Sequence, residues 1–353
     1  MQVDMASRPY RIGVVGASSL AGKELGDELS ESMLAASNVV LLEDDEGVAG
    51  QITSAGEEAA FIQRIEPSSF EGMDFVFFAG DPENTKRHWQ EARKAGASIV
   101  DLTYALEAEK DVLVLAPWAT ESLGGRKKAE PDLKTPAVIA AHPVALMLAL
   151  VAGRLQSEVG VASVAATVME PASQHGRAAM DEMHQQTVSL LSFQSLPREQ
   201  YDAQVAFNLL PALGESAKVK LARTELRIRS QYTELAGESL PHLVLQIVQA
   251  PIFHGYVVSL LVELSKPSTV AEVEAALEGE HIDLVGEDGE PPSNLTAAGQ
   301  EDIMVRVTDD FGDAEKGTRF WLWMAADNLK LTALNAIACA IELRRLRPSG
   351  KVQ

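Results

Sequence analysis

The chain has 353 residues, of which 46% are hydrophobic and 23% are charged, and its formal net charge at pH 7 is −21. This length and this balance predict two globular domains and exclude a disordered or fibrous chain. The strong negative charge excludes proteins that bind nucleic acid or anionic membrane surfaces, because those partners require clustered Lys and Arg side chains.

The first part of the chain alternates apolar runs with helical patterns. Residues 10–15 form an apolar run, which leads through a glycine-containing turn into a helical pattern with apolar positions Leu25, Leu29 and Met33. Further strands are predicted at residues 38–42, 75–78, 98–101 and 112–115, with a helix over residues 82–94. Strands that alternate with helices predict a parallel, doubly wound sheet of the Rossmann type.

The second part of the chain has longer strands, which predict an α+β domain with an antiparallel sheet and helices on one face. These strands are expected at residues 161–169, 243–248, 256–264 and 320–324. A final helix over residues 327–347 has an apolar side and is predicted to complete the first domain. The predicted domains are therefore residues 1–140 together with this helix, and residues 141–326.

The single cysteine, Cys339, cannot form an intramolecular disulfide, and its small apolar neighbours favour a buried place on a helix. We therefore expect a reducing, cytoplasmic location. Residues 1–9 carry no basic and apolar leader and are predicted to form a short disordered start. The most apolar long stretch, residues 137–155, contains His142 and Pro143, so it is predicted to be a strand and a buried helix, not a membrane span.

The turn after the first strand has the context of a dinucleotide fingerprint, in which backbone N–H groups reach a pyrophosphate at the N-terminus of a helix. Its candidate cofactor-binding residues are Gly16, Ser18, Ser19, Leu20 and Gly22. Ser19 replaces the middle glycine of the fingerprint, and a side chain there would crowd a phosphate. The alternative is a plain turn with packed glycines.

Four acidic residues, 43–46, end the second strand, where a carboxylate can bind an adenosine ribose. Asp44 is the candidate for this role. Four negative charges would repel a 2′-phosphate, so NAD is favoured over NADP if the domain binds a dinucleotide. The alternatives are a solvated acidic loop and a domain that binds no dinucleotide.

Further motifs follow one another along nearly the whole chain. They are Ala172-Ser173 with Gly176, residues 180–187, Ala206–Pro211 with Gly214, Pro251–Gly255, and residues 327–330 with Leu334–Ala336. Together with the glycine turn, and in this order, they resemble aspartate-semialdehyde dehydrogenases and the related semialdehyde dehydrogenase family.

The resemblance implies an α/β fold with a Rossmann-type NAD(P)-binding domain, to which Asn328 would add a cofactor contact. It also implies a dimerisation and substrate domain like the C-terminal domain of glyceraldehyde-3-phosphate dehydrogenase. A homodimer formed through this second domain is expected.

The resemblance locates the positions at which the family carries its catalytic residues, and this chain has other residues there. The nucleophilic cysteine should follow the strand at residues 137–140, where Val144 stands, or Ala145 in a gapped alignment. Neither side chain can attack a carbonyl to form an acyl-enzyme. Glu170 occupies the position of the orienting glutamine.

The general-base position holds Tyr256, whose ordinary pKa near 10 prevents it from taking a thiol proton at neutral pH. His254 would share a face with Tyr256 if both lay on one strand, and it is the alternative base. Gln249 replaces the arginine that holds the substrate carboxylate, and a neutral amide cannot form the charged fork.

The remaining substrate positions also differ from the family. Glu107 falls near a phosphate-binding arginine, which reverses the charge, and Ala217 replaces a glutamate, whereas Lys220 matches the family's lysine. We therefore predict no catalytic residue for the family's reaction, and a binding or regulatory role. The alternative is an NAD(P)-dependent oxidoreductase that transfers hydride without a covalent intermediate, with His254 or Tyr256 as the proton donor.

No metal site is predicted, because His142 and His175 are isolated from other ligands and no Cys or His pair has ligand spacing. His184 lies in a helical pattern over residues 174–191 and is assigned to core or dimer packing.

Overall fold

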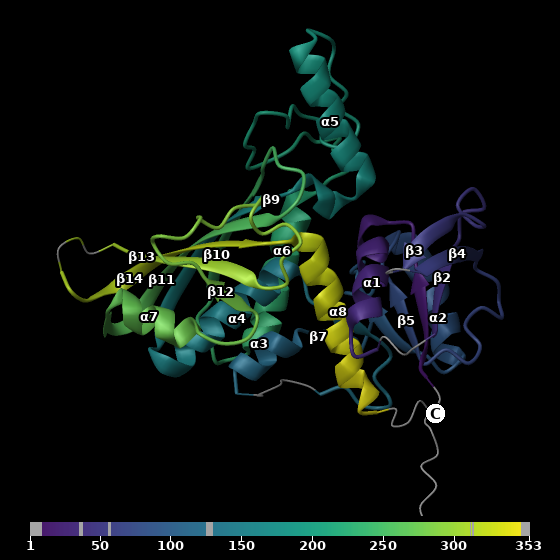
Figure 1. The fold of residues 1–353 in the computed structure, drawn as a ribbon, viewed down its shortest axis with the longest axis horizontal. Helices are drawn as coiled ribbons and strands as arrows, with labels where there is room; N and C mark the ends of the chain where they lie inside the picture. Colours follow the sequence, from purple (N-terminus) through teal and green to yellow (C-terminus); the bar gives the residue numbers. More distant parts are fainter. Residues whose placement is uncertain are drawn as a thin grey trace, which may run out of the picture. The chain divides into compact units, whose positions relative to one another are not determined.

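The computed structural model describes residues 9–34, 38–55, 58–124, 130–310, 312 and 314–346. Apart from Pro9, the predicted disordered start lies outside these residues. The chain divides into two compact units (Figure 1). Unit 1 comprises residues 1–117, 129–141 and 332–353, and unit 2 comprises residues 118–128 and 142–331. Within the described ranges, no helix has the length and apolar character needed to cross a membrane.

Unit 1 is built on an eight-stranded sheet with the strand order β3-β4-β2-β1-β5-β6-β8-β7. Its strands are β1 (Arg11–Val15), β2 (Asn38–Glu43), β3 (Ile52–Ala55), β4 (Glu58–Arg64), β5 (Phe75–Phe78), β6 (Ser98–Asp101), β7 (Leu113–Leu115) and β8 (Val138–Ala140). Neighbouring strands are parallel except for β3 and β4. The predicted Rossmann-type sheet is confirmed, and β3 and β4 extend one edge beyond the strands that the sequence indicated.

Helices cover both faces of this sheet. On one face, α1 (Leu20–Glu31) and α8 (Asn328–Arg344) contribute Leu25, Ile337 and Leu343 to a buried core. On the other face, α2 (Pro82–Lys94) contributes Trp89 and Ala92 to a second core. Asp81 caps α2 by accepting a hydrogen bond from the Glu83 N–H group, and Pro82 suits the first helical position because it has no N–H to satisfy. A sheet with helices on both faces is the doubly wound arrangement.

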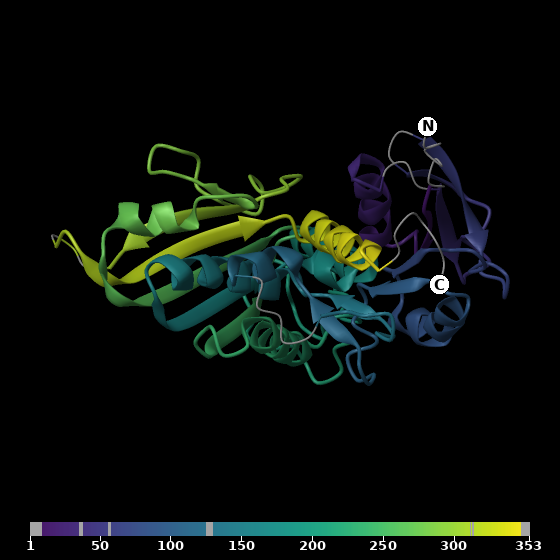
Figure 2. The same ribbon diagram turned by 90° about the horizontal axis from the view of Figure 1, so that it is seen from below.

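Unit 2 is built on a six-stranded sheet with the strand order β10-β9-β11-β14-β13-β12. Its strands are β9 (Val161–Glu170), β10 (Leu243–Gln249), β11 (Tyr256–Ser268), β12 (Ile282–Leu284), β13 (Ile303–Asp309) and β14 (Gly317–Ala326). Figure 2 shows β14 in yellow-green beside β11 in green. The prediction of an antiparallel sheet is wrong for two pairs, β9 with β10 and β12 with β13, which are parallel. The parallel pair places the carboxyl ends of β9 and β10 side by side.

The helices of this unit differ in how much of their surface is exposed to solvent. They are α3 (Pro117–Ser122, of which Pro117 belongs to unit 1), α4 (Pro143–Glu158), the 3-10 turn η1 (Ala172–His175), α5 (Arg177–Leu191), α6 (Leu221–Ala236) and α7 (Val270–Leu277). Helix α4 is buried on all sides along most of its length, as its continuous apolar sequence predicted. The helix predicted over residues 174–191 is divided at Gly176, whose φ of +82° interrupts helical geometry.

Candidate functional site

The glycine turn of unit 1 lies where the strand order of its sheet reverses. Gly16 follows β1 with φ of +85°, and a Cβ atom there would lie 2.3 Å from the Cα atom of Gly80, which follows β5. The turns after β1 and β5 are therefore in backbone contact. Doubly wound sheets bind nucleotides at this kind of position, at the carboxyl ends of parallel strands.

Ser19 has a structural role in this turn. Its Oγ atom accepts a hydrogen bond from the Gly22 N–H group at 2.9 Å and donates one to the Ala79 carbonyl at 2.7 Å. The hydroxyl therefore caps α1, whose first residue is Leu20, and it is turned toward protein groups. A Cβ atom on Gly22 would lie 2.1 Å from the Gly16 carbonyl oxygen, so the close turn requires glycine. This backbone geometry fits a pyrophosphate at the N-terminus of the helix.

The carboxylate beside the glycine turn is that of Glu43. This last residue of β2 is 6% exposed, and its Oε1 atom accepts hydrogen bonds from the Ser18 N–H group, at 2.7 Å, and from the Ser18 hydroxyl. Asp44, the predicted ribose ligand, forms an ion pair with Arg87, and its Oδ1 atom lies 3.5 Å from Nε2 of His88. A solvated acidic loop is therefore the wrong description of Glu43, and Asp44 is partly neutralised by a cation.

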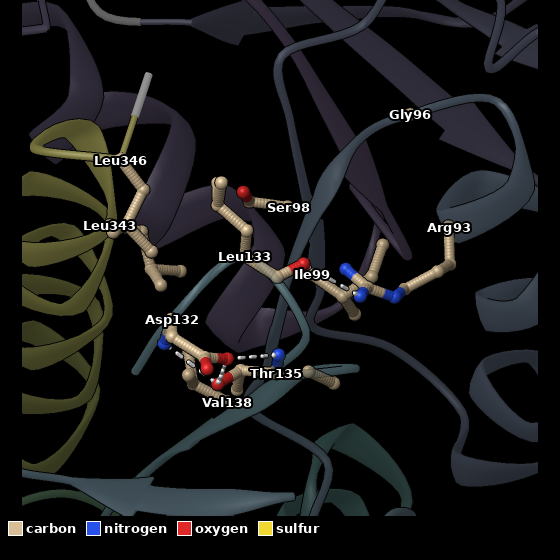
Figure 3. Close-up of a pocket in the computed structure, with 11 residues that line it drawn as sticks. Arg93, Gly96, Ser98, Ile99, Asp132, Leu133, Thr135, Val138, Leu343 and Leu346 are labelled. Atoms are coloured by element: carbon tan, nitrogen blue, oxygen red, sulfur yellow. Dashed lines mark hydrogen bonds between the residues drawn. The ribbon is translucent and has the colours of Figure 1, made fainter. Parts of the chain in front are cut away.

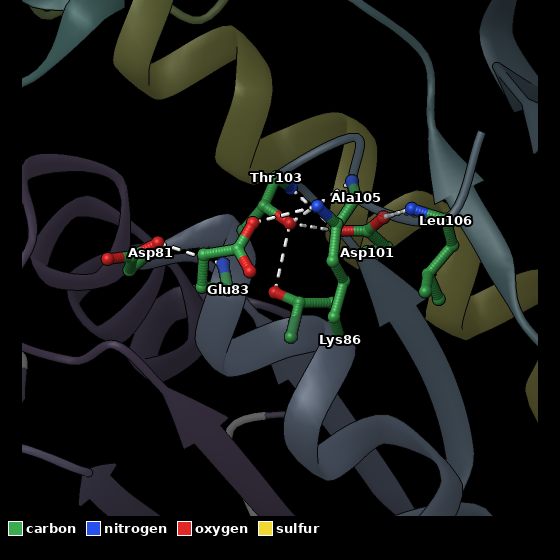
Figure 4. Close-up of polar contacts among 8 residues, drawn as sticks. Asp81, Glu83, Lys86, Asp101, Thr103, Ala105 and Leu106 are labelled. Atoms are coloured by element: carbon green, nitrogen blue, oxygen red, sulfur yellow. Dashed lines mark hydrogen bonds and ion pairs between the residues drawn. The ribbon is translucent and has the colours of Figure 1, made fainter. Parts of the chain in front are cut away.

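Asp101 is a second buried carboxylate at the same edge of the sheet, and its role is structural. Its Oδ1 atom accepts hydrogen bonds from the N–H and hydroxyl groups of Thr103, both at 2.7 Å, and Oδ2 accepts one from the Leu106 N–H group at 3.0 Å (Figure 4). Burial raises the pKa of Asp101. Glu107, near which the resemblance predicts a phosphate-binding arginine, is exposed in the turn that follows.

Unit 1 also contains a cavity of about 220 Å³ at the end of its sheet opposite the glycine turn. Figure 3 shows Arg93, Leu133 and Leu343 around it. The lining includes Ser98 and Val138, which are the first residues of β6 and β8. Because the strands are parallel, this cavity lies at their amino ends and is separate from the glycine turn.

Unit 2 brings together three positions that the resemblance assigned to catalysis. Glu170 ends β9, Gln249 ends β10 in register with it, and Tyr256 begins β11, whose next residue pairs with Met169. All three side chains are fully buried. The Gln249 Nε2 atom donates a hydrogen bond to the main-chain carbonyl of Glu170 at 3.0 Å. These residues form one polar cluster at the end of the sheet.

Val144, which the resemblance assigns to the position of the nucleophile, is connected to this cluster by a histidine. Val144 is fully buried in the first turn of α4, and its N–H group donates a hydrogen bond to Nδ1 of His142 at 3.3 Å. The Nε2 atom of His142 lies 3.3 Å from the Tyr256 Oη atom. The imidazole of His142 therefore lies between the first turn of α4 and the Tyr256 hydroxyl.

His142 is a site residue that the sequence did not indicate, because its partners are distant in the chain. The main-chain N–H group of His142 donates a hydrogen bond to Oε1 of Gln231 at 2.6 Å. Burial, the nearby charge of Arg227 and the proximity of His175 lower the pKa of His142 well below its ordinary value. The ring is therefore neutral. Because Nδ1 accepts a hydrogen bond, the ring proton lies on Nε2 and points to Tyr256.

A second histidine stands beside Glu170. The Nε2 atom of His175 lies 2.8 Å from Oε1 of Glu170, at ion-pair distance, but the two atoms form no hydrogen bond. Tyr201 is also fully buried, and burial together with the carboxylates of Glu182 and Glu170 raises its pKa. His142 and His175 thus belong to one region of unit 2, but the described residues contain no group of three or more His, Cys, Asp or Glu side chains suited to a metal ion.

The other predicted residues lie in different settings. The expectation that His254 shares a strand face with Tyr256 is wrong, because β11 begins at Tyr256 and His254 lies in the preceding loop. Lys220 is exposed at the start of α6, where its Nζ atom donates a hydrogen bond to the Glu215 carbonyl at 3.3 Å. His184 is exposed on α5, so core packing is wrong for it.

Asn328, predicted to contact the cofactor, forms hydrogen bonds within unit 2. Its Oδ1 atom accepts them from the Ser173 hydroxyl at 3.1 Å and from the Gly255 N–H group at 2.9 Å. The side chain is fully buried. It therefore fixes the loop that leads into Tyr256.

Comparisons with known proteins cover both units. The family model of the semialdehyde dehydrogenase NAD-binding domain matches residues 11–125, and that of the semialdehyde dehydrogenase dimerisation domain matches residues 153–331. The chain is 30% identical to a USG-1 protein homolog of Pseudomonas aeruginosa over 94% of this chain and 96% of that protein. It is 27% identical to the aspartate-semialdehyde dehydrogenase of Rickettsia bellii over 96% of this chain and 98% of that one.

A solved structure of a probable aspartate-semialdehyde dehydrogenase from Pseudomonas aeruginosa superposes with a TM-score of 0.82 at 27% identity. The superposition covers 96% of this chain and 100% of that one. An aspartate semialdehyde dehydrogenase from Vibrio cholerae shares the fold, with a TM-score of 0.81 at 20% identity over 96% of this chain and 99% of that one.

Proposed function

This chain belongs to the semialdehyde dehydrogenase family, and we propose that within the family it acts as a binding or regulatory protein without semialdehyde dehydrogenase activity. The observation that carries this proposal is Val144, a fully buried aliphatic side chain at the first turn of α4, which we infer stands in the place of the nucleophile. The chain's one cysteine, Cys339, is buried in the core of unit 1.

The proposal follows from what a thiol-dependent reaction needs. An acyl-enzyme requires a nucleophile that can attack a carbonyl and leave again, and valine has no such atom. Gln249 lacks the charge to hold a carboxylate in a bidentate fork, and Tyr256 cannot act as a base near neutral pH. Since nucleophile, base and anchor have changed together in one buried cluster, the reaction lacks all three of its parts.

The same proposal retains a dinucleotide site and a dimer. The glycine turn and the N-terminus of α1 would hold a pyrophosphate, while the Glu43 carboxylate beside them would accept hydrogen bonds from ribose hydroxyls. A carboxylate there favours NAD over NADP. Exposed aromatic side chains on β14, Trp321 and Trp323, would contribute to a homodimer interface through the dimerisation domain.

The test is an assay of the purified protein with aspartate semialdehyde, phosphate and either NAD or NADP. We expect no reduction of either nicotinamide above the rate without protein. Cys339→Ser is the matched control, and it should behave like the wild type because the buried thiol takes no part. Turnover that depends on the protein would overturn the proposal, and its loss in Cys339→Ser would identify the nucleophile.

A second candidate function rests on the contact between His142 and Tyr256. A bound nicotinamide would supply hydride to a carbonyl carbon, and the Tyr256 hydroxyl would give its proton to the carbonyl oxygen. The Nε2 proton of His142 would stabilise the phenolate that forms. Titrations that detect neither NADH nor NADPH binding would exclude this function. Carbonyl reduction that Tyr256→Phe abolishes without weakening NADH binding would establish it.

A further inference from the structure

The polar cluster of unit 2 contains acceptor atoms that the described residues leave without donors. Both carboxylate oxygens of Glu170 and the Oε1 atom of Gln249 are buried and accept no hydrogen bond from any described residue. The Gln249 Nε2 atom is already occupied, since it donates to the carbonyls of Glu170 and Ala250 at 3.0 and 3.1 Å.

These acceptors lie close to one another. Glu170 and Gln249 are register partners at the ends of two parallel strands, so their side chains point to the same face of the sheet. His175 lies beside Glu170 at ion-pair distance, but it does not complete the set, because its Nε2 atom approaches Oε1 alone and forms no hydrogen bond with it.

A buried carboxylate that accepts no hydrogen bond is costly, because desolvation removes the water that solvated its charge, and the His175 imidazole lies beside Oε1 alone. The cost is recovered when a ligand brings N–H donors and a positive charge into the same place. A primary ammonium group has three donors, and Glu170 and Gln249 together offer three acceptor atoms. A carboxylate or phosphate ligand would instead be repelled by the Glu170 charge.

Glu170 and Gln249 therefore have the reverse hydrogen-bonding character to the one that the resemblance predicts at their positions. A glutamine and an arginine would present donors to an anionic substrate, whereas Glu170 and Gln249 present acceptors. We propose that Glu170 and Gln249 form a recognition site for the protonated amine of a small aliphatic ligand. This inference rests on the proposed function, because it names the class of molecule that the family member binds in place of a carboxylate substrate.

The test compares small probes of opposite charge on the full-length protein. Ethylammonium and propionate are titrated at matched ionic strength, with binding followed by calorimetry and saturation-transfer NMR. We expect ethylammonium to bind in preference to propionate. Glu170→Gln should weaken ethylammonium binding by about 30-fold or more, the usual effect of removing one partner of a buried charge pair.

The net charge of −21 attracts cations in general, so a control must remove a carboxylate elsewhere. Glu263→Gln serves this purpose, because Glu263 is an exposed residue of β11 that accepts a hydrogen bond from Ser163. It should leave the affinity for ethylammonium unchanged. Equal weakening by both variants would mean nonspecific attraction and would overturn the inference.

A double variant tests the same site by reversing its polarity. Glu170→Gln with Gln249→Arg restores the donor pattern that the resemblance assigned, and we expect it to bind propionate and to lose ethylammonium. Preference of the wild type for propionate, or retention of ethylammonium by a folded double variant, would overturn the inference. The turnover assay reads out the proposed function separately, so turnover with aspartate semialdehyde would end that proposal without affecting a Glu170-dependent amine site.

Discussion

The Nε2 atom of His142 and the Oη atom of Tyr256 lie 3.3 Å apart, and both side chains are excluded from solvent. Burial, Arg227 and His175 hold the pKa of His142 well below its ordinary value, so the folded protein keeps the ring neutral. In the unfolded chain the ring takes up a proton near its ordinary pKa of about 6.5. The unfolded state therefore binds more protons as the pH falls, and this residue's contribution to stability is lost below that pH.

We accordingly predict that His142→Gln flattens the pH dependence of unfolding. The free energy of unfolding of the wild type should fall more steeply than that of the variant from pH 7.5 to 5.5, by up to about 1.4 kcal/mol per pH unit at the steepest point. Urea denaturation at several pH values measures both slopes. Parallel slopes would show that the ring titrates alike in the folded and unfolded states.

We predict opposite effects on stability for alanine substitutions at two glycines of unit 1, Gly16 and Gly26. Gly16→Ala should destabilise unit 1 by about 2–4 kcal/mol, because alanine resists positive φ and its Cβ would overlap Gly80. Gly26 lies within α1, and a methyl group added there would meet no neighbouring atom within 4 Å, so Gly26→Ala should stabilise the protein by about 0.5–1 kcal/mol. Thermal unfolding of both variants measures the difference, and similar melting temperatures would contradict the tight turn.

Glu43 predicts the basis of dinucleotide preference. Replacing it with glutamine removes the negative charge beside the glycine turn but keeps an oxygen that can accept from Ser18. Glu43→Gln should therefore weaken NADH binding and reduce the preference for NADH over NADPH by about tenfold, which corresponds to about 1.4 kcal/mol. Asp45→Asn is the control, because this nearby carboxylate accepts from the Gly47 N–H group on the exposed loop. Fluorescence titration measures both ratios, and an equal change in the control would exclude a specific role for Glu43.

The exposed aromatic residues of β14 predict where two copies of the chain meet. Trp321 is 41% exposed although it is a large apolar side chain on a sheet face. Trp321→Glu should place an unpaired charge in the dimer contact and shift the protein toward monomer in sedimentation velocity. Phe61→Glu is the control, since Phe61 is exposed on β4 of unit 1. A dimer that persists in Trp321→Glu would place the interface elsewhere.

The parts of the fold that the sequence predicted are those with strong local signals. β5 is four consecutive apolar residues, and α2 begins with Asp81 and Pro82, which mark a helix start without tertiary information. Strands β3 and β4 were missed because ITSA and EAAFIQR mix polar and apolar residues without a strong period. The direction of β10 beside β9 was also missed, because an apolar strand has the same pattern in either orientation.

The site was predicted in part for a related reason. Glu170, Gln249 and Tyr256 were located through motif order, and the structure places them together, but no spacing rule connects His142 to Tyr256. The sequence indicates Asp44 as a ribose ligand, but residues 43–46 are all acidic, and sequence alone does not tell which of them faces the glycine turn. The strand's last residue, Glu43, faces the glycine turn, and this depends on where the pleat of β2 ends.

Helix α8 follows the strands of unit 1 in the sequence, so the core of unit 1 is completed only after α8 has been synthesised. Ile337, Cys339 and Leu343 belong to the same buried core as Ile12 and Phe75. A ribosome delivers the N-terminal strands first, and domains generally fold as units during synthesis. The apolar face that α8 covers therefore stays open until residues 328–344 have been synthesised. Until then the newly synthesised sheet exposes an apolar surface, and we expect chaperones to bind it.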